Sequence, residues 1–147
     1  MADVVLRPAT SRDAAALAEI HLAARDSARI PNLHDGGDVR AFHGKLIAEA
    51  QVMVAEIAGR AVGYAAVRED WLEHLWVAPT HHRQGIGRKL LGWARQSAAQ
   101  DLKLYVFAHN VGAIAFYYAH GAVEIAASDG RTNEERLPDR TLLISKT

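Results

Sequence analysis

The sequence of 147 residues contains no cysteine. This absence excludes disulfide bonds, catalysis by a thiol and metal sites built from thiolates, and it is compatible with a reducing compartment. The beginning of the chain also lacks the basic segment and apolar run that are typical of a secretory signal. No apolar run approaches the length needed to span a bilayer. We therefore expect a soluble cytoplasmic protein that does not bind membranes.

An excess of charge of one sign is missing as well. The 17 Lys and Arg residues balance the 17 Asp and Glu residues, so the formal net charge is +0 at pH 7. No overall field would draw the chain to nucleic acid, and no nucleic-acid partner is expected. Hydrophobic residues make up 50% of the sequence, enough for one good core, whereas a second domain would be undersized. The sequence predicts a single domain over residues 1–147.

Hydrophobic periodicity predicts alternating strands and helices. Strands are expected at residues 4–6, 52–57, 61–68, 73–77 and 102–107, and around positions 123 and 142–144. One helix is expected after a capping box formed by Thr10 and Asp13, another after a loop opened by Gly36 and Gly37, and two more after residues 85 and 110. This order indicates an α/β fold with a mixed central sheet of about seven strands and helices on both faces.

The most informative segment joins the strand at 73–77 to the helix that follows it. Residues 75–91 read LWVAPTHHRQGIGRKLL, a β-type run that enters a basic turn with two glycines. Gly85 and Gly87 allow a ligand to approach the main chain, where the free N–H groups of the first helical turn point at it. Arg83, Arg88 and Lys89 favour the same interpretation, because cations are unfavourable at a helix N-terminus unless an anion binds there. The segment predicts a phosphate or pyrophosphate site.

Other sites fit these residues less well. A dinucleotide fingerprint requires G-x-G-x-x-G and a P-loop requires G-x-x-x-x-G-K-[ST], whereas residues 84–90 read QGIGRKL. A dinucleotide-dependent oxidoreductase is therefore disfavoured. The spacing of His74, His81 and His82 does not indicate the fixed geometry of a metal site, and adjacent histidines at a phosphate loop are more simply anion donors. No metal is expected.

Residues 82–87 resemble motif A of the GNAT superfamily of N-acetyltransferases, Q/R-x-x-G-x-G/A, whose loop holds the pyrophosphate of acetyl-CoA. His82 stands where the family prefers Gln or Arg, and a histidine can still donate a hydrogen bond. Residues 110–122, NVGAIAFYYAHGA, are similar to motif B of that family, N-x-x-A-x-x-F-Y-x-x-x-G-F. Only Ala122 departs from motif B, replacing the usual aromatic residue. With the flanking strands, the resemblance covers residues 51–127.

The resemblance implies a GNAT acyl-CoA N-acyltransferase fold and an enzyme that transfers acetyl from acetyl-CoA directly to an amine through a ternary complex. The strands at 73–77 and 102–107 would run side by side and then diverge. The amides of the pantetheine arm would pair with the main chain of the strand at 73–77, as an extra strand would. Asn110 would cap its helix and contact CoA. The implied cofactor-binding residues are Leu75, Trp76, Val77, His82, Arg83, Gln84, Gly85, Ile86, Gly87, Arg88, Lys89, Asn110, Phe116 and Tyr117.

Two residues are expected to move protons. An alkyl amine titrates near ~10 and must lose a proton before it attacks, while the departing thiolate benefits from an acid. Through motif B the acid would be Tyr117, with Tyr118 as its local competitor. Strand alternation places Glu73 on the side of Leu75 and His74 on the opposite side. Glu73 is the expected base, through a chain of waters, because family members often carry a carboxylate on this strand; a solvated strand-end acid is the alternative.

The acceptor remains open at the level of the sequence. A protein N-terminus, a lysine, a polyamine, an amino acid or an antibiotic would each supply an amine, and both a monomer and a homodimer are compatible with the family. Trp71 and residues 30–35 are expected to wall the acceptor pocket, while the polar run 129–139 either borders the same opening or is a solvated loop. The alternative to an enzyme is a non-catalytic acyl-CoA-binding or sensing domain of the same fold.

Overall fold

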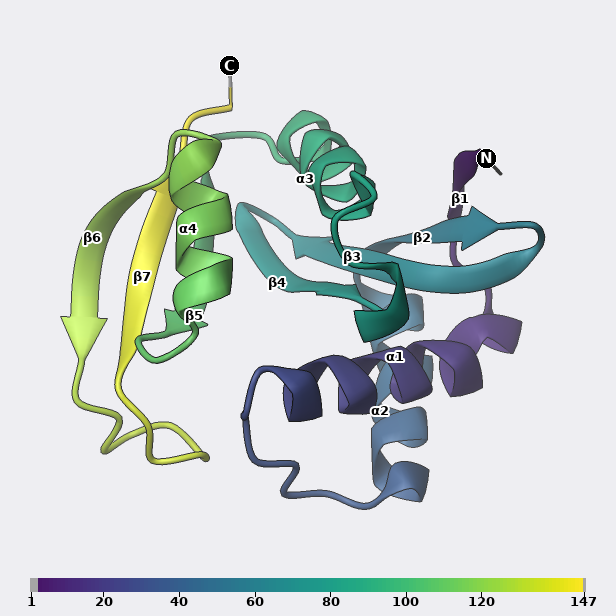
Figure 1. The fold of residues 1–147 in the computed structure, drawn as a ribbon, viewed down its shortest axis with the longest axis horizontal. Coiled ribbons are helices and arrows are strands. Elements are labelled where there is room, and N and C mark those ends of the chain that lie inside the picture. Colours follow the sequence, from purple (N-terminus) through teal and green to yellow (C-terminus); the bar gives the residue numbers. More distant parts are fainter. Residues whose placement is uncertain (1–2, 147) are drawn as a thin grey trace.

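The computed structural model describes residues 3–146. Its seven-stranded mixed sheet has the order β1-β2-β3-β4-β5-β7-β6 (Figure 1). The strands are β1 (Val4–Pro8), β2 (Gln51–Ile57), β3 (Arg60–Arg68), β4 (Trp71–Val77), β5 (Leu102–Phe107), β6 (Val123–Ser128) and β7 (Asp139–Ile144). The helices are α1 (Ala14–Ser27), α2 (Gly36–Glu49), α3 (Ile86–Ser97) and α4 (Val111–Ala119), with 3-10 turns η1 (Ser11–Asp13) and η2 (Pro79–His81). None of the helices within residues 3–146 is long and apolar enough to cross a membrane.

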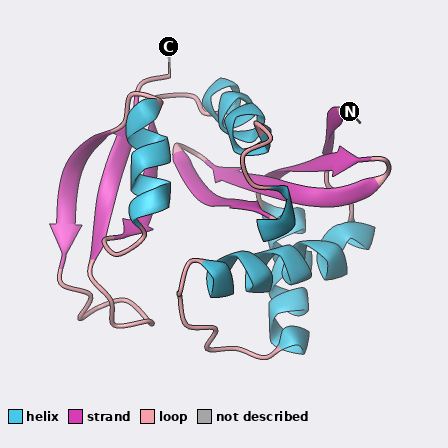
Figure 2. Ribbon diagram, viewed as in Figure 1, coloured by secondary structure: helices cyan, strands magenta, loops and turns pink. Residues whose placement is uncertain are grey.

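Helices cover both faces of the sheet, as Figure 2 shows, which confirms the expected fold class. On one face, Leu17 and Ile20 of α1 and Leu46 of α2 pack against β2 and β3. On the other face, α3 and α4 pack against the sheet in a second cluster. Four apolar residues of α3 and its C-cap, at the spacing of one helix face, are buried there: Ile86, Leu90, Leu91, Ala94 and Ala98. Burying each of the larger side chains stabilises the fold by about 1.5–3 kcal/mol.

The sheet divides between β4 and β5, its parallel neighbours. These two strands share a single residue pair, Trp71 with Lys103. β3 pairs with one edge of β4 from Trp71 to Val77. Beyond Trp71, the opposite edge of β4, which faces β5, has no strand partner within residues 3–146. In Figure 1 the half formed by β5, β7 and β6 turns away from the half formed by β1 to β4. The expected divergence of the two strands is confirmed.

The expected loop at Gly36 and Gly37 is wrong, because both glycines belong to the first turn of α2. Asp35 caps this helix, and its Oδ1 accepts a hydrogen bond from the Asp38 N–H at 2.8 Å. A side chain at the N-cap satisfies one of the free N–H groups of the first turn. This local hydrogen bond outweighs the low helix propensity of the two glycines.

The alternation expected at 73–77 holds from His74 to Val77, where Trp76 packs in one core cluster and Leu75 and Val77 in the other, but a bulge in β4 removes Glu73 from it. His74 pairs with Ala66 of β3 and Leu72 pairs with Val67, so Glu73 is the extra residue between them. A bulge changes which side of the strand the neighbouring residues face. Leu72 and Leu75 consequently pack in the same cluster, which a period of two would not allow.

The predicted capping box ties the start of α1 to β1. The Thr10 N–H donates to the Asp13 carboxylate at 2.7 Å, and Arg7 of β1 donates two hydrogen bonds to it, at 2.8 and 2.7 Å. The Arg7 guanidinium contributes most to holding the pKa of Asp13 below its usual range, and the Thr10 N–H acts in the same direction. Asp13 is buried, whereas the Arg7 side chain is 34% exposed.

Asp13→Asn is expected to lower the free energy of unfolding at pH 7 by about 1.5–3 kcal/mol, because a neutral amide loses bonds made to a charged group. A carboxylate with a pKa depressed by folding stabilises the fold above its unfolded pKa of about 3.9, and this contribution is lost as pH falls through the folded pKa. Urea denaturation should therefore show a difference in the free energy of unfolding between wild type and variant at pH 7, and this difference should disappear at acidic pH. Asp129→Asn, at an exposed ion pair with Arg131, is the control with little effect at pH 7. A difference in the free energy of unfolding between wild type and Asp13→Asn that does not change with pH would contradict the lowered pKa of Asp13.

Candidate active site

The loop between β4 and α3 has the backbone geometry of an anion site. Gly85 is the N-cap of α3 with a φ of 78°, and Arg83 has a φ of 64°, both in the left-handed region. Such turns direct successive N–H groups toward a common point. The Lys89 N–H donates to the Gly85 carbonyl at 3.1 Å, so the N–H groups of the turn before it have no helical acceptor.

Cationic side chains surround this turn without a counter-charge. Arg83, Arg88 and Lys89 are exposed, and none of them forms an ion pair with a carboxylate anywhere in residues 3–146. Gln84 is exposed beside them. The helix dipole disfavours cations at this end, so a bound anion would relieve their repulsion. The residues present fit a pyrophosphate.

Several predicted cofactor residues also have structural contacts. A Cβ atom at Gly87 would lie 3.4 Å from the Phe116 ring, so this glycine lets α3 approach α4 closely. The Ile86 side chain is buried in the core, which leaves only its main chain for a ligand. His82 donates from Nε2 to the Val77 carbonyl at 3.1 Å and thereby holds the loop against the end of β4.

Tyr117 of α4 has a buried ring and an unpartnered hydroxyl group. The ring packs in the cluster between α3, α4 and β5. Its hydroxyl has no hydrogen-bond partner in residues 3–146, yet it is not sealed from solvent. Burial raises the pKa of Tyr117, so the phenol keeps its proton at neutral pH. Tyr118 is 44% exposed. Asn110 caps α4 as expected, since its Oδ1 accepts from the Ala113 N–H at 3.3 Å.

A cavity of about 340 Å³ lies on the face covered by α1 and α2. Its lining residues are His21, Arg25, Asn32, Leu33, His34, Asp38, Val39, Phe42, His74, Glu134 and Glu135. Residues 32–34 are among them, and Glu134 and Glu135 show that the polar run 129–139 borders the same opening. Trp71 is not part of this lining, contrary to expectation, because its ring stacks on Tyr105 of β5 at 4.7 Å between centroids.

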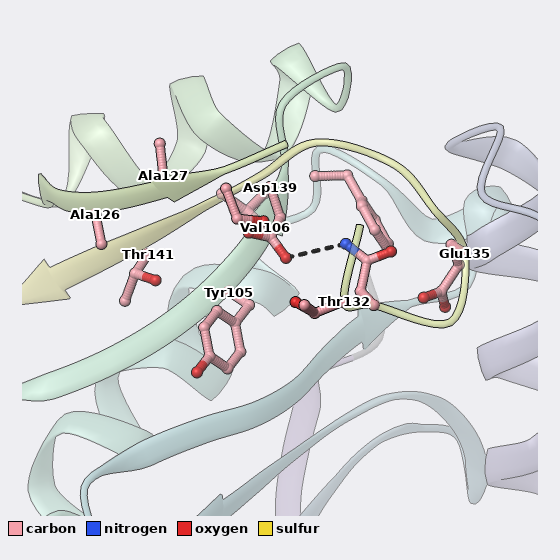
Figure 3. A pocket seen from close by; sticks show the side chains of 11 residues that line it. Tyr105, Val106, Ala126, Ala127, Thr132, Glu135, Asp139 and Thr141 are labelled. Atoms are coloured by element: carbon pink, nitrogen blue, oxygen red, sulfur yellow. Dashed lines mark hydrogen bonds between the residues drawn. The ribbon is translucent and has the colours of Figure 1, made fainter. Parts of the chain in front are cut away.

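A second hollow of about 490 Å³ lies against β5, β6 and β7 (Figure 3). Tyr105, Thr132 and Asp139 line it, and an Asn133 side-chain N–H donates to Asp139 at 3.2 Å. Glu135 borders both hollows. The Glu135 carboxylate binds Arg25 of α1 at 2.7 Å, so this ion pair lies where the two hollows meet.

Three histidines from different elements lie close together, and two of them, His21 and His74, line the first cavity. Ring centroids lie 5.0 Å apart for His21 and His43, 5.7 Å for His21 and His74, and 6.2 Å for His43 and His74. Burial is the main cause that lowers the pKa of His21 and of His74 to about 3, and it also lowers the pKa of His43. All three rings are therefore neutral at pH 7. Within residues 3–146, no group of His, Asp and Glu side chains is arranged to hold a metal ion.

Sequence reasoning missed His21 and His43. A signal for His43 was present, because it lies four residues after Val39 and three before Leu46, on the apolar side of α2. A polar residue on such a stripe indicates a buried hydrogen-bonded group. Tyr64 of β3, whose hydroxyl lies between these two histidines, was likewise not recognised.

Glu73 is placed away from this cluster. Its Oε1 accepts a hydrogen bond from Arg68 Nε at 3.0 Å, and Arg68 also contacts Glu49 of α2 at 3.5 Å. Glu73 is exposed and borders neither of the two hollows, whereas its neighbour His74 lines the first. The bulge accounts for this difference between adjacent residues.

Comparisons with known proteins agree with this geometry. Peptidyl-lysine N-acetyltransferase YiaC from Escherichia coli K12 is 37% identical over 76 residues, which is 51% of this chain and 51% of that protein, so the match spans about half of each. A GCN5-related N-acetyltransferase from Rhodopseudomonas palustris superposes with a TM-score of 0.83, 23% identity and coverage of 99% of this chain and 97% of the other. YncA from Salmonella typhimurium, solved with its cofactor acetyl-CoA, has a TM-score of 0.79, 21% identity and coverage of 99% and 95%.

The family comparison includes both sequence motifs. The model of the acetyltransferase (GNAT) family matches residues 17–122, a segment that runs from the first turns of α1 to the end of motif B. The match contains the basic loop with its glycines, the divergence of β4 and β5, and Tyr117. The chain belongs to the GNAT acetyltransferase family.

Proposed function

We propose that this protein transfers acetyl from acetyl-CoA directly to a primary amine while both are bound. The observation that carries the proposal is the divergence of β4 and β5 after one residue pair. Among the described residues 3–146, it leaves main-chain groups of Leu75, Trp76 and Val77 without a strand partner on one edge, next to the first turn of α3. An extended chain that contains amides can add to such an edge as another strand would.

Acetyl-CoA would supply the acetyl group and a thiolate leaving group. The free N–H groups after Gly85, with Arg83, Arg88 and Lys89, would hold its pyrophosphate. Phe116 and Asn110 would contact the arm that crosses toward α4. The Tyr117 hydroxyl would donate its proton to the departing sulfur, which its raised pKa permits because the phenol is protonated at neutral pH.

The charges around the first cavity favour a cationic acceptor. Asp38, Glu134 and Glu135 line it, and within residues 3–146 only Glu134 and Glu135 form ion pairs, with His34 and Arg25. An alkyl amine arrives mostly as an ammonium ion, which carboxylates attract. Because a relative over half of the chain is named a peptidyl-lysine N-acetyltransferase, we propose the side chain of a peptide lysine as the first acceptor to test.

Acetyl-CoA and CoA are expected to raise the thermal midpoint by roughly 5–10 °C at a hundredfold excess over the dissociation constant, whereas NAD should not. Thiol release from acetyl-CoA would then be measured with a lysine peptide, a polyamine and free amino acids. Release with one of these amines and not with buffer supports the enzyme. Stabilisation by CoA without release for any amine would favour the non-catalytic acyl-CoA-binding domain, and stabilisation by NAD alone would contradict CoA binding.

A further inference from the structure

A chain of hydrogen bonds runs inward from the first cavity, and its direction is set at the buried end. His43 Nδ1 lies 2.8 Å from the Val39 carbonyl oxygen. A carbonyl only accepts, so His43 Nδ1 carries the hydrogen and donates. His43 is fully buried and its pKa is lowered, so the ring is neutral and has only this one N–H. His43 Nε2 must therefore accept.

The next two members of the chain follow from this assignment. The Tyr64 hydroxyl lies 2.5 Å from His43 Nε2 and donates its hydrogen to that nitrogen. The same oxygen is 3.3 Å from His21 Nδ1, and with its hydrogen already committed it accepts from His21. His21 Nδ1 therefore carries the hydrogen of the neutral ring. His21 Nε2 is left with a lone pair.

The lone pair of His21 opens to the cavity. The His21 ring is 9% exposed and lines the cavity. Its Nε2 has no hydrogen-bond partner within residues 3–146, but this atom is accessible to solvent. His74 has the opposite arrangement, because its Nδ1 accepts from Trp76 Nε1 at 3.2 Å and its hydrogen therefore lies on Nε2. The cavity thus offers one acceptor nitrogen and one donor nitrogen.

The other charged groups near His21 do not occupy this nitrogen. Arg25, one turn later on α1, is bound to Glu135, and His34 is bound to Glu134 at 2.6 Å. The remaining titratable groups that face His21 or line the cavity are His43, Tyr64, His74 and Asp38. An incoming ammonium ion would carry hydrogen-bond donors that match the free lone pair.

We propose that His21 Nε2 accepts the proton of the acceptor amine, and that Tyr64 and His43 are positioning residues that hold its lone pair toward the cavity. This role depends on the proposed acetyl transfer. The ammonium form first releases one proton to solvent, which leaves the neutral amine to attack. As the N–C bond forms and the C–S bond breaks, a second proton moves from nitrogen to Nε2, its bonding pair stays on nitrogen, and the sulfur takes the Tyr117 proton. Burial lowers the pKa of His21, so the ring is neutral at pH 7 and its Nε2 lone pair is free to accept this proton.

Long-range ¹⁵N–¹H spectra of the histidine-labelled full chain test the hydrogen-bonded chain without any substrate. His21 and His43 are expected as Nδ1–H tautomers and His74 as the Nε2–H tautomer at pH 7. Tyr64→Phe keeps the buried ring and removes only the hydroxyl, so the tautomer preference of His21 should be lost. Tyr118→Phe, at an exposed tyrosine, should leave it unchanged. An Nε2–H tautomer at His21 in the wild type would overturn the proposal.

Kinetics test the role itself. His21→Phe is expected to lower kcat by about 10²–10⁴-fold with little change in the KM for acetyl-CoA, and His21→Gln should keep the hydrogen-bond acceptor without restoring proton transfer. Tyr64→Phe should lower kcat less than His21→Phe. Full turnover in His21→Phe, together with loss of turnover in Glu73→Gln, would overturn the role of His21. The proposed acetyl transfer would still hold. Failure of the wild type to acetylate any amine would overturn the proposed function and this role together.

Discussion

Tyr117→Phe is expected to lower kcat by about 10²–10⁴-fold while the affinity for acetyl-CoA stays nearly constant. The substitution removes one oxygen atom and keeps the ring that packs between α3 and α4. Because the hydroxyl has no partner within residues 3–146, its removal breaks no internal hydrogen bond and should not lower stability. The departing thiolate alone loses an interaction, so the effect should appear in turnover. Initial rates and binding of acetyl-CoA, measured on the same preparation, check this prediction.

Tyr118→Phe is the matched control for this experiment. Tyr118 is the next residue of α4, and its side chain is 44% exposed. Its variant should keep full turnover. If Tyr118→Phe is the variant that loses activity, the alignment with motif B is shifted by one residue. If both variants keep activity, the thiolate leaves without help from either hydroxyl.

Arg88→Glu is expected to weaken the binding of CoA by about 10–100-fold while slightly raising the stability of the free protein. The loss follows from replacing one charge-assisted contact by a repulsive charge, and each 1.4 kcal/mol is about tenfold in affinity. The gain follows from the helix dipole, because an acidic residue in the first turn contributes about 0.3–1 kcal/mol. Arg88 forms no ion pair within residues 3–146 that the substitution would break. Titration calorimetry and urea denaturation measure the two effects separately.

Lys45→Glu supplies the control for net charge. Lys45 is exposed on α2 and does not belong to the loop between β4 and α3, and the substitution changes the charge by the same amount. It should leave CoA affinity nearly unchanged at physiological salt, since distant exposed charges are screened. Equal weakening in both variants would mean that CoA responds to overall charge. Unchanged affinity in Arg88→Glu would mean that the phosphates bind elsewhere.

Features that depend on near neighbours in the chain were predictable from the sequence. The capping box at Thr10 and Asp13, the apolar stripe of α3 and the cap at Asn110 each involve residues a few positions apart. Their geometry follows from helix periodicity and from local hydrogen bonds. Each of the two motifs is a continuous segment, so the loop proposed to bind an anion and its cationic residues could be identified without coordinates.

Features that depend on distant partners were missed or misplaced. The position of Glu73 depends on a bulge, which arises from how β4 pairs with β3. Trp71 was expected at the acceptor pocket and instead stacks on Tyr105, thirty-four positions later. Neither the pairing of β4 with β3 nor the contact of Trp71 with Tyr105 produces a periodic pattern in the sequence, since strand register is set by the neighbouring strand.

The sequence by itself determined the fold class and the family, and it predicted a site for the CoA phosphates, because these follow from short patterns whose physical effect is local. Only the tertiary structure decided which side chains gather at the cavity proposed for the acceptor. It brings His21, His43, Tyr64 and His74 together from two helices and two strands, and it pairs Arg25 with Glu135 across the opening. The tautomer of a buried histidine depends on which donors and acceptors the fold places around it. The tautomer of each of these histidines is therefore determined only when segments far apart in the sequence have packed together.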